Sequence, residues 1–193
     1  IRDSTRPNRI HQFVFDSQSG LLSPNEPATI DRGPDSGPRH LWFHPDGRFA
    51  YGSDEQGSSV TAYRFVEPNG TLAPFQTISS LPKEGFSERK STSDIEVHPS
   101  GRFVYIANRG YDAIVGYSIS PHDGTLSVIG HTSSETTTRS FNITPDGRYL
   151  VAAGQASGRL ALFQIGDSGE LKRLQTIDAG KAPWWVTTFS HSH

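Results

Sequence analysis

Two short motifs alternate along this chain and constrain its fold more than any other feature. A Pro-turn anchor, His/Thr-Pro-Asp/Ser-Gly-Arg, begins at residues 44, 98 and 144, so the spacings are 54 and 46 residues. A Gly-x-Leu motif alternates with it and begins at residues 20, 70, 124 and 169. A repeat period of about 40–50 residues is typical of β-propeller blades.

The residues around each anchor predict four antiparallel strands per repeat. In the anchor, Pro presets φ, Asp bonds its own backbone and Gly tolerates positive φ, as a tight turn requires. Strand-like runs flank it, as at residues 41–43 and 48–52, and a run rich in β-branched and aromatic residues follows at 60–66. An outer strand after the Gly-x-Leu turn, at 75–79, completes the blade. We therefore expect an all-β fold, a β-propeller of four-stranded antiparallel blades.

The motif positions divide the chain into consecutive parts of one partial propeller, with about half of a ring. We expect the end of a blade at 1–36, blades at 37–80, 93–131 and 139–178, a loop at 81–92, and the first strand of a closing blade with a tail at 180–193. The N-terminal half of the propeller, from the same protein or another chain, would then be needed to close the ring.

Composition excludes several classes of function. With 19 Gly and 13 Pro among short apolar runs, no stretch approaches the ~20 apolar residues that span a bilayer. The net charge of −2 gives no basic field for nucleic acid. There is no Cys, which fits a reducing compartment, so we expect a cytoplasmic protein. The chain begins at Ile1 and not at a Met, so the given sequence does not include the natural start at which a signal peptide would be read.

Superposing the anchors brings polar residues of different types onto one rim. The residues eleven after the anchor start are Glu55, Arg109 and Gln155, and those five and four before it are Arg39 with His40, Ser93 with Asp94, and Arg139 with Ser140. Structural positions in a repeat should converge on similar residues, whereas these positions differ from blade to blade. Such variation suits the binding of an asymmetric ligand.

The chemistry of this rim suggests a small anionic substrate. Arginine binds carboxylate or phosphate in bidentate fashion, and a Glu among arginines can act as a base. The alternative is structural, because Arg39 and Glu55 could form a plain ion pair of little energetic value and Arg109 could cap carbonyls between blades. Arg89 lies in the long 81–92 loop, which is either a surface loop or a flap over the site. No metal-ligand spacing is present.

These residues resemble those of a known family, the seven-bladed β-propeller lactonases, which includes 6-phosphogluconolactonases and carboxy-muconate cyclases. The resemblance rests on Gly37-Pro38-Arg39-His40 with the first anchor, on Asn108-Arg109-Gly110, and on three later segments at 139–142, 152–155 and 184–186. It implies a metal-independent site at the mouth of the central channel, without a cofactor. It also implies catalytic roles for Arg39, Glu55 and Arg109, and a catalytic His one blade earlier, at a position that would precede Ile1.

We therefore expect a lactonase that hydrolyses a small anionic sugar lactone similar to 6-phosphogluconolactone. Arg39 and Arg109 would hold the anionic group and polarise the lactone carbonyl, and Glu55 would activate water or orient the His. Four residues, together with Arg89, would bind substrate: His40, Asp94, Arg139 and Gln155. The alternatives are a muconate-type lactonising cyclase acting on a carboxylate substrate, and a non-catalytic propeller that binds an anion or a protein.

Overall fold

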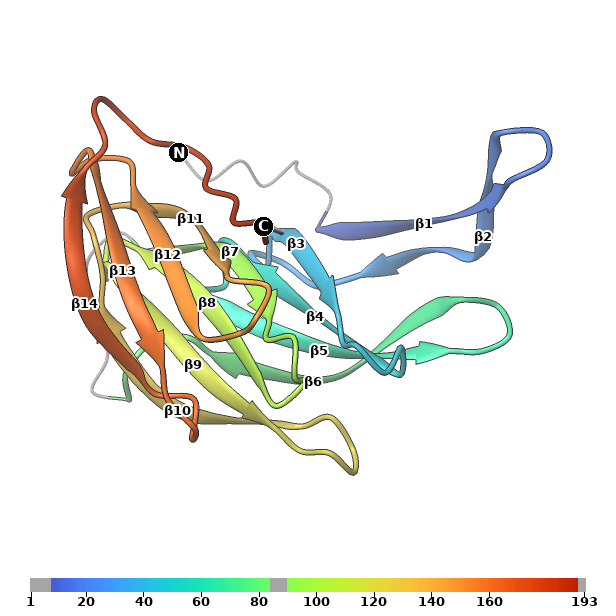
Figure 1. The fold of residues 1–193 in the computed structure, drawn as a ribbon. Helices are drawn as coiled ribbons and strands as arrows, with labels where there is room; N and C mark the ends of the chain where they lie inside the picture. The colour runs from blue at the N-terminus through green and yellow to red at the C-terminus, as the bar shows by residue number, and fades with distance from the viewer. Residues whose placement is uncertain (1–7, 84–89, 191–193) are drawn as a thin grey trace.

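The protein is built from β-strands throughout the part described by the computed structural model, residues 8–83 and 90–190 (Figure 1). Fourteen strands form three four-stranded sheets and one two-stranded sheet, and all pairings are antiparallel. The predicted all-β class of four-stranded antiparallel blades is confirmed. The described residues include no helix long and apolar enough to cross a membrane.

Each four-stranded sheet is one repeat of the sequence, with its strands paired in chain order. The first sheet consists of β3 (Pro38–Phe43), β4 (Phe49–Asp54), β5 (Ser59–Val66) and β6 (Thr71–Ser79). The second consists of β7 (Ser91–Val97), β8 (Phe103–Arg109), β9 (Ala113–Ile119) and β10 (Leu126–Ser133). The third consists of β11 (Thr138–Ile143), β12 (Tyr149–Gly154), β13 (Arg159–Ile165) and β14 (Leu171–Asp178).

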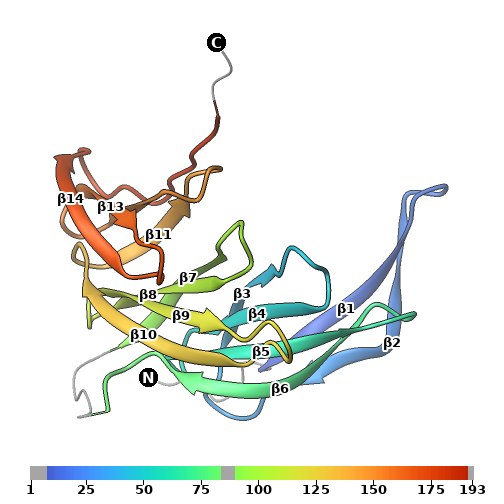
Figure 2. The ribbon, with the colours of Figure 1, turned by 60° about the horizontal axis from the view of Figure 1, so that its bottom comes forward.

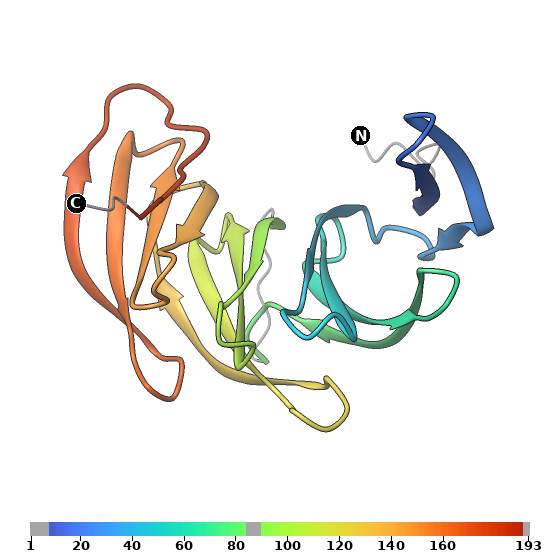
Figure 3. The same ribbon diagram turned by 45° about the vertical axis from the view of Figure 1, so that its right-hand side comes forward.

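The sheets stand side by side in an open arc, which does not close into a ring (Figures 2 and 3). The hairpin of β1 (Arg9–Asp16) and β2 (Leu21–Asp31) lies at one end of the arc, and the third sheet lies at the other. Strand β3 contacts β7, and β7 contacts β11, so the first strand of each four-stranded sheet faces the inside of the arc. Residues 179–190 follow β14 and are not paired into a sheet.

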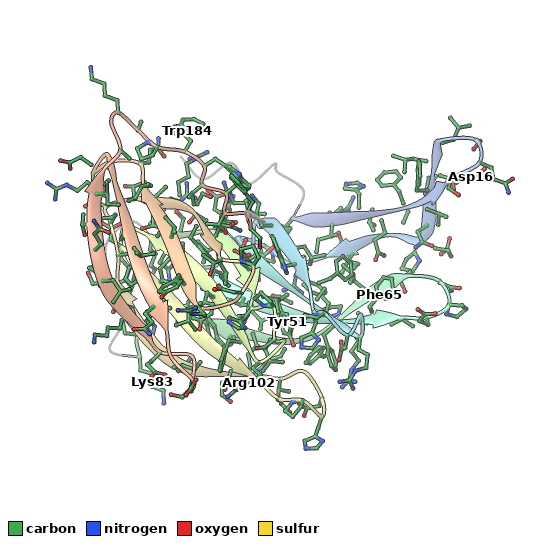
Figure 4. All side chains as sticks on the ribbon, in the orientation of Figure 1. Asp16, Tyr51, Phe65, Lys83, Arg102 and Trp184 are labelled. Carbon is green, nitrogen blue, oxygen red and sulfur yellow. The ribbon has the colours of Figure 1, made fainter. Side chains whose placement is uncertain are left out.

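The core lies between neighbouring sheets, because both faces of a middle strand are buried. On β8, Val104 and Ile106 contact the first sheet, whereas the alternate residues Phe103 and Tyr105 contact the third. Side chains on a strand alternate between faces, so one strand serves two interfaces. Tyr51, labelled in Figure 4, is fully buried, and its hydroxyl donates to the Gly124 carbonyl of the next sheet at 2.9 Å.

The Pro-turn anchors join adjacent sheets at the end opposite the predicted rim. His44 Nε2 lies 2.8 Å from the carbonyl oxygen of Gly101, and His98 Nε2 lies 2.8 Å from that of Gly147. Both glycines have positive φ, as the turn requires. A Cβ on Gly101 would lie 2.6 Å from His44 Nε2, so only glycine accepts both the turn conformation and the close approach of the ring.

Candidate active site

The rim forms where the first strand of a sheet begins and the second ends. Pro38 of β3 pairs with Asp54 of β4 at this edge. Arg39 is the second residue of β3, at an irregularity in the pairing, and Glu55 directly follows the last residue of β4. The Glu55 amide donates to the Gly37 carbonyl at 2.7 Å, which closes the edge. Gly37 has φ +61°, and a Cβ there would lie 3.1 Å from the backbone nitrogen of Gln56, so a side chain would disturb the rim.

Glu55 bridges two arginines that come from different sheets. Arg39 Nε lies 3.4 Å from Glu55 Oε2, and Arg109 Nη2 of the second sheet donates to Glu55 Oε1. Arg109 Nη2 also donates to the Thr92 carbonyl at 3.1 Å, and Arg39 Nη1 donates to the Ser93 carbonyl. The structure thus brings together the three residues predicted to be catalytic, in contact across a sheet boundary.

The guanidinium groups of this cluster are partly buried, and this burial makes their charged form less favourable than it is in water. Partial burial lowers the pKa of the Arg39 guanidinium below its ordinary value, the Glu55 carboxylate opposes that change, and Arg109 and Arg139 add to it. The two arginines of the bridge are only 20% and 16% exposed. Two partly desolvated guanidinium groups that share one carboxylate leave positive charge available to an anion.

His40 and Asp94 form a second pair beside the first. His40 Nδ1 lies 2.8 Å from Asp94 Oδ1, across the boundary between β3 and β7. The His40 side chain is 32% exposed and the Asp94 side chain only 9%. Asp94 also accepts the backbone N–H of Ile95 at 3.1 Å and that of Phe141, on the third sheet, at 3.2 Å. Asp94 therefore links three sheets and is held from several directions.

Arg139 and Gln155 lie together on the third sheet, as the superposition predicts. Arg139 Nη1 lies 3.4 Å from Gln155 Oε1, and the Arg139 guanidinium lies 4.3 Å from the centre of the Trp184 ring. Figure 4 shows Trp184 on the segment that follows β14, at the opposite end of the sheets from Arg102. Arg89 lies outside the described residues, so its predicted position over the site stays a prediction.

Sequence reasoning missed a row of polar residues that lies two residues further along the same strands. Glu96 Oε2 accepts the Ile143 amide at 2.9 Å, and both carboxylate oxygens lie 3.2 Å from Asn142 Nδ2. Asn142 Oδ1 in turn accepts the Thr188 amide at 2.7 Å. Burial raises the pKa of Glu96 to about 7, against the lowering effect of these hydrogen bonds. Moving the superposition two residues along the strand, on the same face as Asp94, would have found Glu96 and Asn142.

A cavity of about 180 Å³ opens beside the first strand of the first sheet. Its lining includes Arg9 and Ile10 of the β1–β2 hairpin, Arg39 and His40 of β3, and Tyr63 of β5. The space thus adjoins both pairs of the rim. Within the described residues, no three His, Cys, Asp or Glu side chains are grouped so that they could hold a metal ion.

An open array of four-stranded blades with a charged rim at the ends of the inner strands defines the class of β-propellers. The family described as "Lactonase, 7-bladed beta-propeller" matches residues 7–188, and the chain belongs to this family. The membership expected from the sequence motifs is confirmed.

Sequence relatives of the chain include two enzymes named 6-phosphogluconolactonase. The chain is 35% identical over 187 residues to that of Klebsiella pneumoniae (strain 342), covering 96% of this chain and 56% of the relative. It is 36% identical over 182 residues to that of Cronobacter sakazakii (strain ATCC BAA-894), covering 94% and 54%. The chain therefore spans about half the length of the curated relatives it matches.

Solved structures of proteins named as lactonases also superpose on this chain, and again the chain covers about half of each. The periplasmic gluconolactonase PpgL of Pseudomonas aeruginosa superposes with a TM-score of 0.83 at 32% identity, over 91% of this chain and 49% of PpgL. A putative 6-phosphogluconolactonase from Bacteroides fragilis superposes with a TM-score of 0.81 at 29% identity, over 91% of this chain and 50% of that chain.

Proposed function

We propose that the complete protein containing this chain is a lactonase that hydrolyses a small anionic sugar lactone similar to 6-phosphogluconolactone. The observation that carries the proposal is the bridge from Arg39 through Glu55 to Arg109, which places two guanidinium groups from adjacent blades on the rim. The names of the relatives support the reaction class, since two are called 6-phosphogluconolactonase and PpgL is called a gluconolactonase.

Each arginine then has a task that its position supports. One guanidinium of the bridge binds the phosphate of the substrate, and the other donates to the lactone carbonyl oxygen, on which negative charge grows as water attacks. Glu55 holds the two guanidinium groups at a fixed separation. Arg139, oriented by Gln155 and by the Trp184 ring, lies on the next blade, where it contributes to binding the sugar.

The complete site needs more polypeptide than this chain provides. The sheets form an open arc, and the relatives are about twice as long as their matched region. The N-terminal half of the propeller, in the same protein or from another chain, would close the ring and face Arg39 and His40 across the cavity beside β3. We keep the cytoplasm as the proposed location, although the similar PpgL is periplasmic.

The test is a comparison of substrates with the full-length protein. We expect hydrolysis of 6-phosphogluconolactone with a higher kcat/KM than of gluconolactone, which offers no phosphate to the arginines. Because lactones also hydrolyse in water alone, each rate is corrected with a protein-free blank. Turnover of carboxymuconate in place of either lactone would identify the cyclase alternative, and binding of 6-phosphogluconate without any turnover would identify a non-catalytic protein.

A further inference from the structure

The pair of His40 and Asp94 has the geometry of a proton-accepting dyad rather than of a simple ion pair. Resting on the lactonase activity proposed above, we propose that His40 Nε2 is the base that activates water in this site, and that Asp94 is the residue that positions it. Glu55, for which the sequence suggested this role, then acts as the positioning residue of the two arginines.

The contacts around Nδ1 determine which ring nitrogen carries the proton. Asp94 Oδ1 lies 2.8 Å from Nδ1, whereas the Arg39 guanidinium, the other candidate partner, is 3.5 Å away. The shorter contact is a normal hydrogen bond and the longer one lies at the limit. A carboxylate can only accept, so the neutral ring donates its Nδ1 proton to Asp94. Nε2 is left with its lone pair.

Nε2 is not engaged by the groups around it. Within residues 8–83 and 90–190 it has no hydrogen-bond partner, the His40 side chain is 32% exposed, and His40 is one of the residues that line the cavity of about 180 Å³ beside β3. The charged groups in contact with the ring are Asp94 on β7 and Arg39 on β3, and Arg9 on β1 lines the same cavity. Glu55 differs from His40, because both of its oxygens are engaged by guanidinium groups.

The repeat itself separates this role from a structural one. At the equivalent position of the next two blades, Asp94 and Ser140 accept backbone N–H groups from the neighbouring inner segment, those of Phe141 and Val186. At these two positions the link between blades is made by a side-chain acceptor. His40 instead donates to its neighbour, and its second nitrogen has no part in the link.

The proposed step is a balanced hydrolysis. Water adds its oxygen to the lactone carbonyl carbon as His40 Nε2 takes one of its protons, and the carbonyl becomes an oxyanion next to a guanidinium. Asp94 stabilises the imidazolium that forms. When the ring C–O bond breaks, the leaving oxygen takes the proton from Nε2 and becomes a hydroxyl group. The product is a hydroxy acid, which loses its carboxyl proton to solvent.

The decisive variant is His40→Asn in the full-length protein, with 6-phosphogluconolactone as the substrate. Asn keeps an N–H donor near the Nδ1 position, so the link to Asp94 survives, but it has no base at the Nε2 position. We expect a folded protein whose kcat falls about 10²- to 10⁴-fold, the usual contribution of a general base. The decline of kcat/KM toward acid pH should disappear with it. His98→Gln, in a turn histidine at the end of the sheets opposite the rim, should leave that pH profile unchanged.

Asp94→Asn and a spectroscopic measurement complete the test. Asp94→Asn should lower kcat and move the acid limb to lower pH, because an amide stabilises the imidazolium less than a carboxylate does. Nitrogen NMR of the wild-type imidazole should show His40 protonated at Nδ1 and not at Nε2. Wild-type turnover or an unchanged acid limb in His40→Asn would overturn the proposal and leave the base to the upstream half of the propeller. A wild-type protein that hydrolyses no lactone would instead overturn the proposed function and the catalytic role together.

Discussion

Glu55 and Arg109 are 54 residues apart in sequence and joined by a hydrogen bond between the ends of two different blades. Because Glu55 also contacts Arg39, one carboxylate sets the separation of two cations. The bridge thus couples the alignment of the first two blades to the geometry of the rim.

Removing the charge of this bridge should therefore damage catalysis more than folding. In Glu55→Gln the two guanidinium groups lose their common counter-ion and repel each other. We expect kcat/KM for 6-phosphogluconolactone to fall at least about 10²-fold, as for other lost electrostatic or positioning groups. The matched control is Asp178→Asn, which breaks the exposed pair with Arg159 and should leave kcat/KM within about twofold, since surface ion pairs contribute little. Equal losses in both variants would contradict the role of the bridge.

Two turn glycines offer a matched pair for stability. Gly47→Ala and Gly101→Ala both place a side chain at positive φ, +74° and +71°, which costs about 1 kcal/mol. Only Gly101 has the His44 ring within 2.6 Å of the new Cβ, whereas nothing lies within 4 Å at Gly47. Gly101→Ala should thus lower the free energy of unfolding by clearly more than Gly47→Ala. Urea denaturation of the two variants measures this, and equal losses would mean that the ring yields without cost.

Glu96 should make folding depend on pH in the direction opposite to that of an ordinary ion-paired carboxylate. Its pKa rises from 4.5 to about 7 on folding, so the folded state binds more protons between these values. The free energy of unfolding therefore falls as pH increases from about 4.5 to about 7, by as much as ~3 kcal/mol. Glu96→Gln keeps an acceptor for the Ile143 amide and removes this part of the slope. Urea midpoints from pH 4.5 to pH 8 measure it, and identical slopes for wild type and variant would refute the prediction.

The two adjacent tryptophans near the C-terminus should behave differently. Trp184 stacks under the Arg139 guanidinium at 4.3 Å, whereas Trp185 donates to the Thr187 hydroxyl at 2.9 Å and is 68% exposed. A cation–π contact at such a site is worth about 0.5–1 kcal/mol, so Trp184→Leu should raise KM roughly two- to fivefold with little change in kcat. Trp185→Leu should leave both constants unchanged. A larger effect of Trp185→Leu would show that Arg139 is not held by its ring contact.

The repeated motifs predicted the rim residues because each lies at a fixed offset from a turn. Arg39, Glu55 and Arg109 could therefore be placed on one edge before any contact was known. The contacts between these residues could not be predicted in this way. They depend on the angle between neighbouring sheets, and the sequence of one repeat contains no information about that angle. The superposition placed Arg109 and Arg139 on the same rim as Arg39 and Glu55, without showing which of them are in contact. Arg139 instead contacts Gln155 and Trp184, and His40 reaches Asp94.

The turn histidines have a consequence for how the propeller comes apart. His44 and His98 each fasten their own sheet to the glycine of the next turn. The third anchor has Thr144 at this position, and its hydroxyl bonds within its own turn, to Asp146 at 2.5 Å and to the Tyr149 backbone. The three four-stranded sheets are thus connected to one another by turn histidines. The turn of the third sheet has no histidine with which to contact a following blade. We expect the blades of the assembled ring to separate first at that boundary when the protein unfolds in heat or denaturant.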